Sequence, residues 1–316
     1  MPHPAPLIAV VGPTAAGKTA VAIRLAEDFA GEIVSADSRQ IYRGLDIGTA
    51  KPTPEERARV PHHLIDIVEP DQEFHVAQFQ AAAYAAFDDI HRRGKLPFLV
   101  GGTGQYVHAV VEGWQIPPAP PDPDLRARLS AEAEEHGPQH LHRRLAQIDP
   151  EAAARIHPNN VRRVIRALEV YQVTGRPISA WQQKRPPAYR ILQIGLTMDR
   201  QALYERIDAR VDRMIADGLL EEVRRLLERG YSFDLPAMTS LGYGEFEPYF
   251  QGESTLEEVV RAIKHATHRF VRHQYNWFSE DDPNIHWFEL SSRGGTARSD
   301  VYDDLHRLVA GFLKAG

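Results

Sequence analysis

The loop Gly12-Pro-Thr-Ala-Ala-Gly-Lys18-Thr19, which fits the pattern G-x-x-x-x-G-K-[ST], constrains the fold of this chain more than any other feature. An apolar run, Leu7–Val11, precedes the loop, and Ala20–Ala30 follows with an apolar residue at every fourth position. A strand, a glycine-rich turn and a helix in this order direct backbone N–H groups and a helix N-terminus at an anion. We therefore predict a diphosphate site, with Lys18 as its cation and Thr19 as a ligand to Mg²⁺. The predicted diphosphate-binding residues are Gly12, Pro13, Thr14, Ala15, Ala16, Gly17, Lys18 and Thr19.

Composition is that of a globular enzyme. At 316 residues the chain can form two domains, or one domain with an insertion. The absence of cysteine excludes disulfides and thiolate chemistry, and there is neither a signal-peptide pattern nor an apolar run of the roughly 20 residues that span a bilayer. We expect a cytoplasmic monomer without membrane association. The net charge of −6 argues against a nucleic-acid partner unless basic residues cluster.

Short apolar runs alternate with helical patterns in the first part of the chain. We expect strands at 32–36 and 97–100 and a helix at 78–93. This alternation predicts an α/β fold with a parallel, P-loop NTPase-like sheet. A proline-rich linker at 116–123 then leads into successive helical segments. Late in the chain, Ser254-x-x-Glu257 predicts a capping box at a helix start. The predicted parts are a first core segment at 1–112, a helical insertion at 113–187, and 188–316, which continues the core and ends in helices.

Two polar segments follow predicted strands, Ser35–Tyr42 and Gly101–Tyr106. In parallel sheets the chemistry lies beyond the carboxyl ends of the strands, so we expect Asp37 and Thr103 to face the crevice that holds the diphosphate. There the Asp37 carboxylate could accept a proton from a nucleophile or hold a metal-bound water. Asp37 could instead cap a helix, and the glycine-rich turn could serve tight packing alone.

Basic residues cluster in two segments. Arg162 and Arg166 share one face of a predicted helix, and residues 261–273 carry four Lys or Arg, three His and no acid. Trp277 follows directly. Arginines beside aromatic side chains suit the phosphates and bases of single-stranded or looped RNA. The alternative is a solvated helix face beside core aromatics.

Taken together, these segments resemble the tRNA dimethylallyltransferases, also called tRNA isopentenyltransferases. The matching strings, in chain order, are Gly12–Thr19, Ser35–Tyr42, Ile47–Pro52, Pro61–Asp66, Gly101–Tyr106, Ile156–Asn160, Arg162-Arg163, Arg166–Val170, the Arg206/Arg210 helix ending at Gly218-Leu219, Leu241–Tyr243 and Gln274-x-x-Trp277. The resemblance implies transfer of a dimethylallyl group from dimethylallyl diphosphate to the N6 amine of the adenosine immediately 3′ of certain tRNA anticodons. It also implies that the helical insertion grips the anticodon stem-loop.

The resemblance assigns roles to individual residues. It implies that Asp37 accepts the N6 proton and that Arg210 closes on the diphosphate, stabilising charge on the leaving group. The target adenosine would leave its stack to reach them. The implied tRNA-contacting residues are Asp37, Ser38, Arg39, Gln40, Thr103, Arg126, Arg162, Arg163, Val164, Ile165, Arg166, Thr239, Ser240, Leu241, Gly242, Tyr243, Gly244, Arg272, His273, Gln274 and Trp277. The chain departs from the family pattern at His268 and His273, where arginines are usual, and at Gly244, where Lys or Arg is usual.

Three other functions fit parts of the pattern. A related transferase that prenylates free AMP or ADP would share the diphosphate site, but the Arg162/Arg166 face of the insertion is surplus for so small an acceptor. A P-loop small-molecule kinase would use the same loop for ATP. An RNA-binding module with a purely structural P-loop would not need Asp37 beside a diphosphate.

Overall fold

The computed structural model describes residues 4–181, 183–185, 187–290 and 299–315. Its internal contacts divide the chain into two compact units. The first unit combines Met1–Val111 with Ala188–Gly316, and the second is Glu112–Pro187. The second unit begins one residue before the predicted insertion. Among the described residues, no helix is both long enough and apolar enough to cross a membrane.

A parallel sheet of six strands forms the centre of the first unit, in the order β3-β2-β4-β1-β5-β6. The strands are β1 (Ala5–Val11), β2 (Gly31–Ser35), β3 (His62–His63), β4 (Leu96–Val100), β5 (Tyr189–Thr197) and β6 (Ile285–Glu289). Although β5 follows the whole second unit in the sequence, it pairs with β1 from Ala5↔Tyr189 to Val11↔Gly195. The interrupted core is thus completed by the strand that resumes after the insertion.

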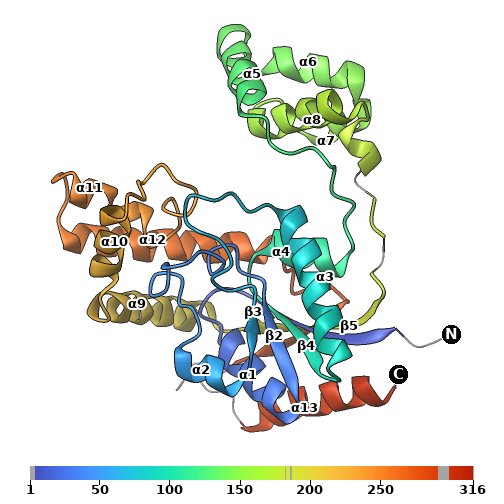
Figure 1. Cartoon of the computed structure of the whole chain (residues 1–316), viewed down its shortest axis with the longest axis vertical. Helices are drawn as coiled ribbons and strands as arrows, with labels where there is room; N and C mark the ends of the chain where they lie inside the picture. The colour runs from blue at the N-terminus through green and yellow to red at the C-terminus, as the bar shows by residue number, and fades with distance from the viewer. Residues whose placement is uncertain (1–3, 182, 186, 291–298, 316) are drawn as a thin grey trace. The chain divides into compact units, whose positions relative to one another are not determined.

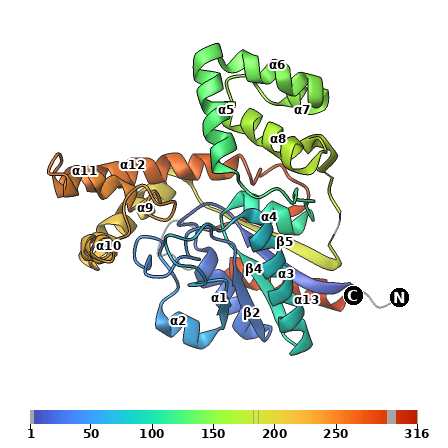
Figure 2. The same cartoon turned by 45° about the horizontal axis from the view of Figure 1, so that its top comes forward.

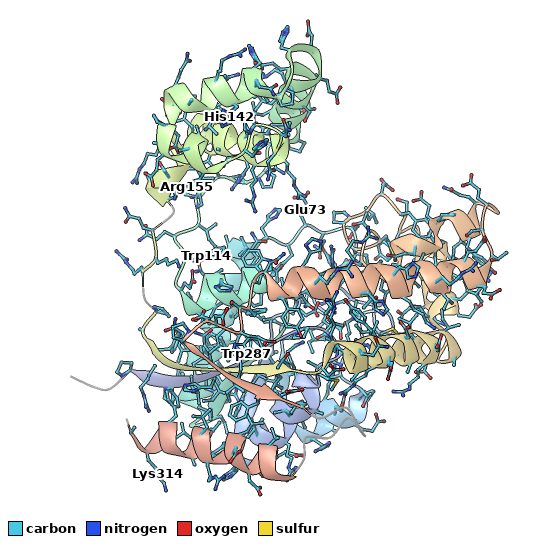
Figure 3. All side chains as sticks on the ribbon, turned by 180° about the vertical axis from the view of Figure 1, so that it is seen from behind. Glu73, Trp114, His142, Arg155, Trp287 and Lys314 are labelled. Atoms are coloured by element: carbon cyan, nitrogen blue, oxygen red, sulfur yellow. The ribbon has the colours of Figure 1, made fainter. Side chains whose placement is uncertain are left out.

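Helices cover both faces of this sheet. On one face lie α3 (Val76–Arg92) and α4 (Gly104–Val111), and on the other α1 (Lys18–Asp28) and α13 (Ser299–Lys314) (Figure 1). The buried residues of α3 are Phe79, Ala83, Phe87 and Ile90, the face that its periodicity predicts. At the outer strand β6, Trp287 lies against β5, where a Cβ on Gly195 would come within 2.5 Å of the indole (Figure 3). The helices on the two faces hold the sheet in place, and the candidate site lies at the carboxyl ends of its strands.

A further group of helices belongs to the first unit, and two of them, α9 (Arg200–Ala216) and α12 (Leu256–Tyr275), line a cavity together with the P-loop. The group also contains α10 (Leu219–Glu228) and α11 (Glu247–Phe250), while α2 (Pro54–Arg59) follows β2 (Figure 1). The α12 capping box was predicted one residue too early. Its N-cap is Thr255, whose side chain accepts from the N–H of Glu258. Ser254 and Thr255 both have Glu three residues later, so the pattern fits either position.

The second unit is a bundle of α5 (Pro123–His136), α6 (Pro138–Ile148), α7 (Pro150–Arg155) and α8 (Val161–Thr174) (Figure 2). Three of these helices begin with proline, whose fixed φ suits the first helical position. His142 of α6 lies within 3.0 Å of the carbonyl oxygens of Ala153 and Ile156 through Nε2, tying α6 to α7 (Figure 3). The core of this unit contains Leu125, Leu129, Leu141, Leu145, Val164, Ile165 and Leu168.

Candidate active site

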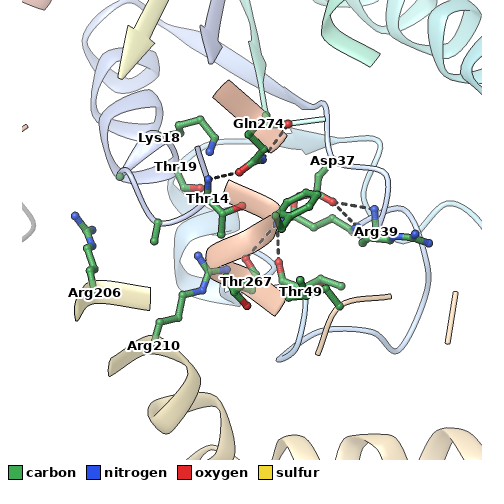
Figure 4. Close-up of a pocket in the computed structure, with 18 of the residues that line it drawn as sticks. Thr14, Lys18, Thr19, Asp37, Arg39, Thr49, Arg206, Arg210, Thr267 and Gln274 are labelled. Atoms are coloured by element: carbon green, nitrogen blue, oxygen red, sulfur yellow. Dashed lines mark hydrogen bonds between the residues drawn. The ribbon is translucent and has the colours of Figure 1, made fainter. Parts of the chain in front are cut away.

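A cavity of about 970 Å³ lies in the first unit, at the carboxyl ends of its central strands (Figure 4). Its walls come from the P-loop, from the segments after β2 and β4, and from α9 and α12. The charged and hydroxyl side chains that line it include Thr14, Lys18, Thr19, Asp37, Ser38, Arg39, Thr103, Arg206, Arg210, Arg213 and Thr239. The structure therefore brings five of the eight predicted diphosphate residues (Thr14, Ala15, Gly17, Lys18 and Thr19), both predicted catalytic residues and Thr103 to one site, whereas Gly12, Pro13 and Ala16 do not line the cavity.

The P-loop adopts a conformation that needs glycine at both ends. Gly12 has φ 137°, and a Cβ there would lie 2.2 Å from the carbonyl oxygen of Leu196, while Gly17 has φ 93°. Lys18 Nζ donates to the Pro13 carbonyl at 2.7 Å, so the ammonium is held at the mouth of the loop. Burial lowers the pKa of Lys18 to about 8, against the opposing charge of Asp37. An anion bound in the loop would stabilise the charged form of this buried lysine.

Gln274 of α12 holds the P-loop in place. Its Oε1 accepts from the N–H of Thr14 at 2.7 Å, and its Nε2 donates to the carbonyl of Gly102 at 3.0 Å (Figure 4). The side chain is only 4% exposed. Both ends of the amide are thus used within the protein, but Gln274 also lines the cavity, so the predicted tRNA contact at this residue stays a prediction.

Asp37 caps a turn and also lines the cavity. Its Oδ1 accepts from the N–H groups of Arg39 and Gln40, at 2.8 and 3.3 Å, and so caps the turn that follows β2 (Figure 4). Within the described part of the chain, Oδ2 has no hydrogen-bond partner. Thr103 Oγ1 accepts from the N–H of Ser38 at 3.1 Å and fixes the same turn from the β4 side. One carboxylate oxygen therefore holds the turn, and the Asp37 side chain also lines the cavity.

Helix α9 presents three arginines to the cavity, Arg206, Arg210 and Arg213, spaced so that they share one face. Burial lowers the pKa of Arg210, and the nearby Asp37 carboxylate opposes that effect. No group of three or more acidic or histidine side chains that could hold a metal occurs among the described residues. A Mg²⁺ ion would therefore depend on the Thr19 hydroxyl, the donor's phosphate oxygens and water, a ligand set that this ion accepts.

One buried carboxylate that the sequence analysis missed supports the cavity wall. Glu222 of α10 is 3% exposed and accepts from the N–H groups of Asp46, Ile47 and Gly48, at 3.1, 2.9 and 3.2 Å. It also accepts from the Tyr243 hydroxyl at 2.6 Å. Tyr243, expected to contact tRNA, is fully buried, and that expectation is corrected. Nothing local in the sequence connects Glu222 to a loop more than 170 residues earlier.

Removing the Tyr243 hydroxyl tests this network. We expect Tyr243→Phe to lower the free energy of unfolding by about 1 kcal/mol or more, because the buried Glu222 carboxylate loses a donor. Urea unfolding of the purified protein measures it. The control is Tyr249→Phe, since the Tyr249 hydroxyl has no hydrogen bond among the described residues. Equal stabilities of the two variants would mean that the Tyr243–Glu222 bond contributes nothing.

In the second unit, the predicted tRNA residues separate into exposed and buried sets. Arg162 and Arg163 are exposed on α8. Val164 and Ile165 lie in the core of the unit, so the expectation that their side chains contact tRNA is corrected. Helical periodicity turns these two positions inward when the arginines face outward.

Arg126 and Arg166 share a buried partner. Both bind Glu169, which is fully buried: Arg126 through Nε and Nη2 at 2.7 and 2.8 Å, and Arg166 through Nη1 at 2.6 Å. Arg166 Nη1 also donates to the carbonyl of Ala119 at 2.9 Å. The carboxylate offsets one of the two positive charges, so Arg166 contributes less to an anion-binding surface than its place on the helix face predicts.

The basic segment of α12 is also divided. Arg272, His273 and Trp277 are exposed, with Trp277 41% accessible and packed over Gly104. His268 instead stacks on Tyr204 with ring centroids 4.2 Å apart, and its Nε2 lies 2.9 Å from Asp208 Oδ1. At this position, where the family pattern usually has an arginine, the imidazole therefore packs against α9.

The predicted tRNA residues in the segment after α10 also separate into cavity-lining and buried ones. Thr239 and Leu241 line the cavity, and Gly242 and Gly244 lie in the turn beside them. Ser240 is buried, and its hydroxyl donates to the carbonyl of Ala237. The expectation that the Ser240 side chain contacts tRNA is therefore corrected.

Comparison with known proteins identifies the family of this chain. The family model described as IPP transferase matches residues 40–281, more than half of the chain, and an isopentenyl transferase model matches residues 5–66. A tRNA dimethylallyltransferase from Roseiflexus sp. (strain RS-1) is 63% identical over 273 residues, covering 86% of this chain and 90% of the relative. One from Symbiobacterium thermophilum is 52% identical over 306 residues, covering 96% and 95%.

Solved structures agree in fold. The tRNA isopentenylpyrophosphate transferase of Bacillus halodurans is 44% identical, with a TM-score of 0.72 over 98% of this chain and 97% of that one. A eukaryotic dimethylallyltransferase acting on tRNA is 28% identical, with a TM-score of 0.80 over 94% and 77%. The protein is thus of the P-loop α/β class of prenyl-transferring enzymes. Within that class, the chain belongs to the tRNA dimethylallyltransferase family. The predicted family and fold class are confirmed.

Proposed function

We propose that the cavity of the first unit transfers a dimethylallyl group from dimethylallyl diphosphate to the N6 amine of the adenosine 3′ of the anticodon, with Asp37 as the base. Family membership confirms the predicted tRNA dimethylallyltransferase activity. The observation that carries the assignment of residues is the convergence of Asp37 with Lys18 and Arg210 in one cavity. A base beside a diphosphate-binding loop suits transfer of a carbon group from a diphosphate to an amine, because the amine must lose a proton.

In the proposed reaction, the bond from the donor's C1 carbon to the diphosphate oxygen breaks, and its electron pair leaves with the diphosphate. The N6 nitrogen forms the new bond to C1, and its proton passes to Asp37 Oδ2. The P-loop N–H groups, Lys18 and Arg210 stabilise the negative charge that grows on the leaving diphosphate. Bound at Thr19, Mg²⁺ would neutralise part of the same charge.

Binding of tRNA is assigned to exposed cations in both units. On α8 these are Arg162 and Arg163, and on α12 the cation is Arg272, with the exposed His273 beside it. Most of their contacts would be to phosphates, which position the RNA without reading its sequence. Trp277 offers an exposed aromatic face on which an unstacked base can lie. Clustering of this kind lets a protein of net charge −6 hold RNA.

A competition between acceptors tests the proposed function. Labelled dimethylallyl diphosphate is supplied with Mg²⁺ and either unmodified tRNA or AMP. We expect label in tRNA and none in AMP, because the exposed α8 arginines serve an acceptor larger than a nucleotide. Label in AMP at a comparable rate would instead identify an adenylate isopentenyltransferase.

The salt dependence of tRNA binding separates the exposed arginines from the ion-paired ones. We expect Arg163→Ala to weaken tRNA binding and to reduce the slope of log affinity against log salt by about 0.7, the value for one phosphate contact on a single strand. Affinities measured at several salt concentrations give the slope. Arg144→Ala, on α6 of the same unit, is the control. An unchanged slope in Arg163→Ala would remove α8 from the tRNA-binding surface.

A further inference from the structure

Arg206 is a cation in the cavity that neither the P-loop pattern nor the proposed mechanism uses. It lies one helical turn before Arg210 on α9 and lines the same cavity. Its Nη1 is enclosed, and no described protein atom accepts a hydrogen bond from it. Nor does any described carboxylate form an ion pair with the side chain. A guanidinium nitrogen that is removed from water without an acceptor destabilises the protein unless a ligand supplies one.

The guanidinium of Arg206 lies against the P-loop. Its Nη1 and Nη2 are 3.8 and 3.9 Å from the point that a Cβ on Gly17 would occupy. Gly17 immediately precedes Lys18, so Arg206 approaches the end of the loop from which the N-terminus of α1 is directed at an anion. A phosphate in the loop would thus meet Arg206 as well as Lys18.

The cations of the cavity form an ordered row with respect to Asp37. The Asp37 carboxylate acts on the pKa of both Lys18 and Arg210. It does not act on Arg206, whose pKa is lowered by burial and by the charge of Arg213. Figure 4 shows the same order, with Asp37 and Arg206 on opposite sides of the cavity and Lys18, Thr19 and Arg210 between them. The row therefore runs from Asp37 through Lys18 and Arg210 to Arg206.

This order fixes the orientation of a diphosphate donor. In the proposed function, on which this inference rests, the reacting carbon must lie beside Asp37, and that carbon is attached to the proximal phosphate. The terminal phosphate must then lie at the far end of the row. We propose that Arg206 binds the terminal phosphate of the donor and thereby makes the site specific for a diphosphate over a monophosphate. Lys18 and Arg210 bind the proximal phosphate, which any phosphate ester would offer.

Calorimetric binding of two probes, inorganic diphosphate and inorganic phosphate, tests this assignment in the full-length protein with Mg²⁺ present. We expect Arg206→Gln to weaken diphosphate binding by roughly 10- to 100-fold, as for loss of a charge-assisted hydrogen bond, and to change phosphate binding less than about threefold. Arg206→Lys should recover part of the loss. In the transfer assay, the KM for dimethylallyl diphosphate should rise more than kcat falls. Arg200→Gln, in the exposed first turn of α9 and outside the cavity lining, is the matched control and should bind diphosphate nearly as the parent does.

Two results would overturn the inference. One is an equal loss of diphosphate and phosphate binding in Arg206→Gln, which would make Arg206 a general anion attractor. The other is an equal loss in Arg206→Gln and Arg200→Gln, which would mean that only the summed positive charge of α9 attracts the diphosphate. Failure of the proposed function itself looks different, because the parent protein would then transfer no label from dimethylallyl diphosphate to tRNA, whatever its affinity for inorganic diphosphate. Melting temperatures of the variants that are no lower than that of the parent show that the comparison is between folded proteins.

Discussion

Asp37→Asn is expected to reduce the rate of dimethylallyl transfer by roughly 10²–10⁴-fold, the range for loss of a general base. The substitution is chosen because Asn keeps an oxygen that can accept from the N–H groups of Arg39 and Gln40, as Asp37 Oδ1 does. The turn after β2 should therefore survive, and only the proton acceptor is lost. Single-turnover transfer to saturating tRNA measures the effect on the chemical step.

Binding measurements separate this prediction from a structural effect. Affinities for inorganic diphosphate and for tRNA should change much less than the rate. Asp37→Ala is the companion variant, because it removes the cap as well as the base and should also destabilise the fold. Near-normal turnover by Asp37→Asn would leave Asp37 with the capping role alone.

Lys18→Met should lower donor affinity and transfer rate together, with a loss of about 10²–10³-fold in rate. The ammonium stabilises charge that grows as the allylic bond breaks.

The pKa of Lys18 also affects stability. Its value is about 8 in the folded protein and 10.5 in an unperturbed lysine, so the unfolded chain binds more protons between these two pH values. The folded protein therefore gains stability as the pH rises through that window. At pH 7 the charged lysine opposes folding, and Lys18→Met should melt no lower than the parent.

The same pKa predicts a pH dependence of binding. Affinity for inorganic diphosphate should fall as the pH rises through about 8, because Lys18 loses its proton there in the free protein. Lys18→Arg remains charged over this range, so its curve contains only the titration of the diphosphate and of other groups. Calorimetry from pH 7 to 9.5, without metal, compares the two proteins. Parallel curves would show that Lys18 does not contact the diphosphate.

Features with a local signal could be predicted from the sequence. The inward face of α3 follows from the periodicity of its apolar residues. The P-loop can be predicted because its backbone has positive φ angles at its two glycines, and such angles favour glycine. Long-range partners have no such signal. The contacts of Gln274 with Thr14, and of Glu222 with the 46–48 loop, join residues more than 170 positions apart. The two-residue strand β3 is too short to show a period.

The corrected tRNA residues have a common cause. A family resemblance assigns a segment, whereas the direction of each side chain depends on the helix that carries it. Val164 and Ile165 were included with their arginine neighbours although the 3.6-residue period turns them into the core. The charge of Arg166 was expected to be free for RNA, but Glu169, three residues further on, binds it.

The most direct test of the central assignment is the stoichiometry of one turnover without any nucleoside triphosphate. Protein in excess over labelled dimethylallyl diphosphate is mixed with unmodified tRNA and Mg²⁺, and labelled tRNA and released diphosphate are both measured. We predict one dimethylallyl group on tRNA for each diphosphate released, with the P-loop binding the donor directly. Transfer that requires ATP, or ATP hydrolysis in step with turnover, would contradict the assignment of this P-loop to the donor diphosphate.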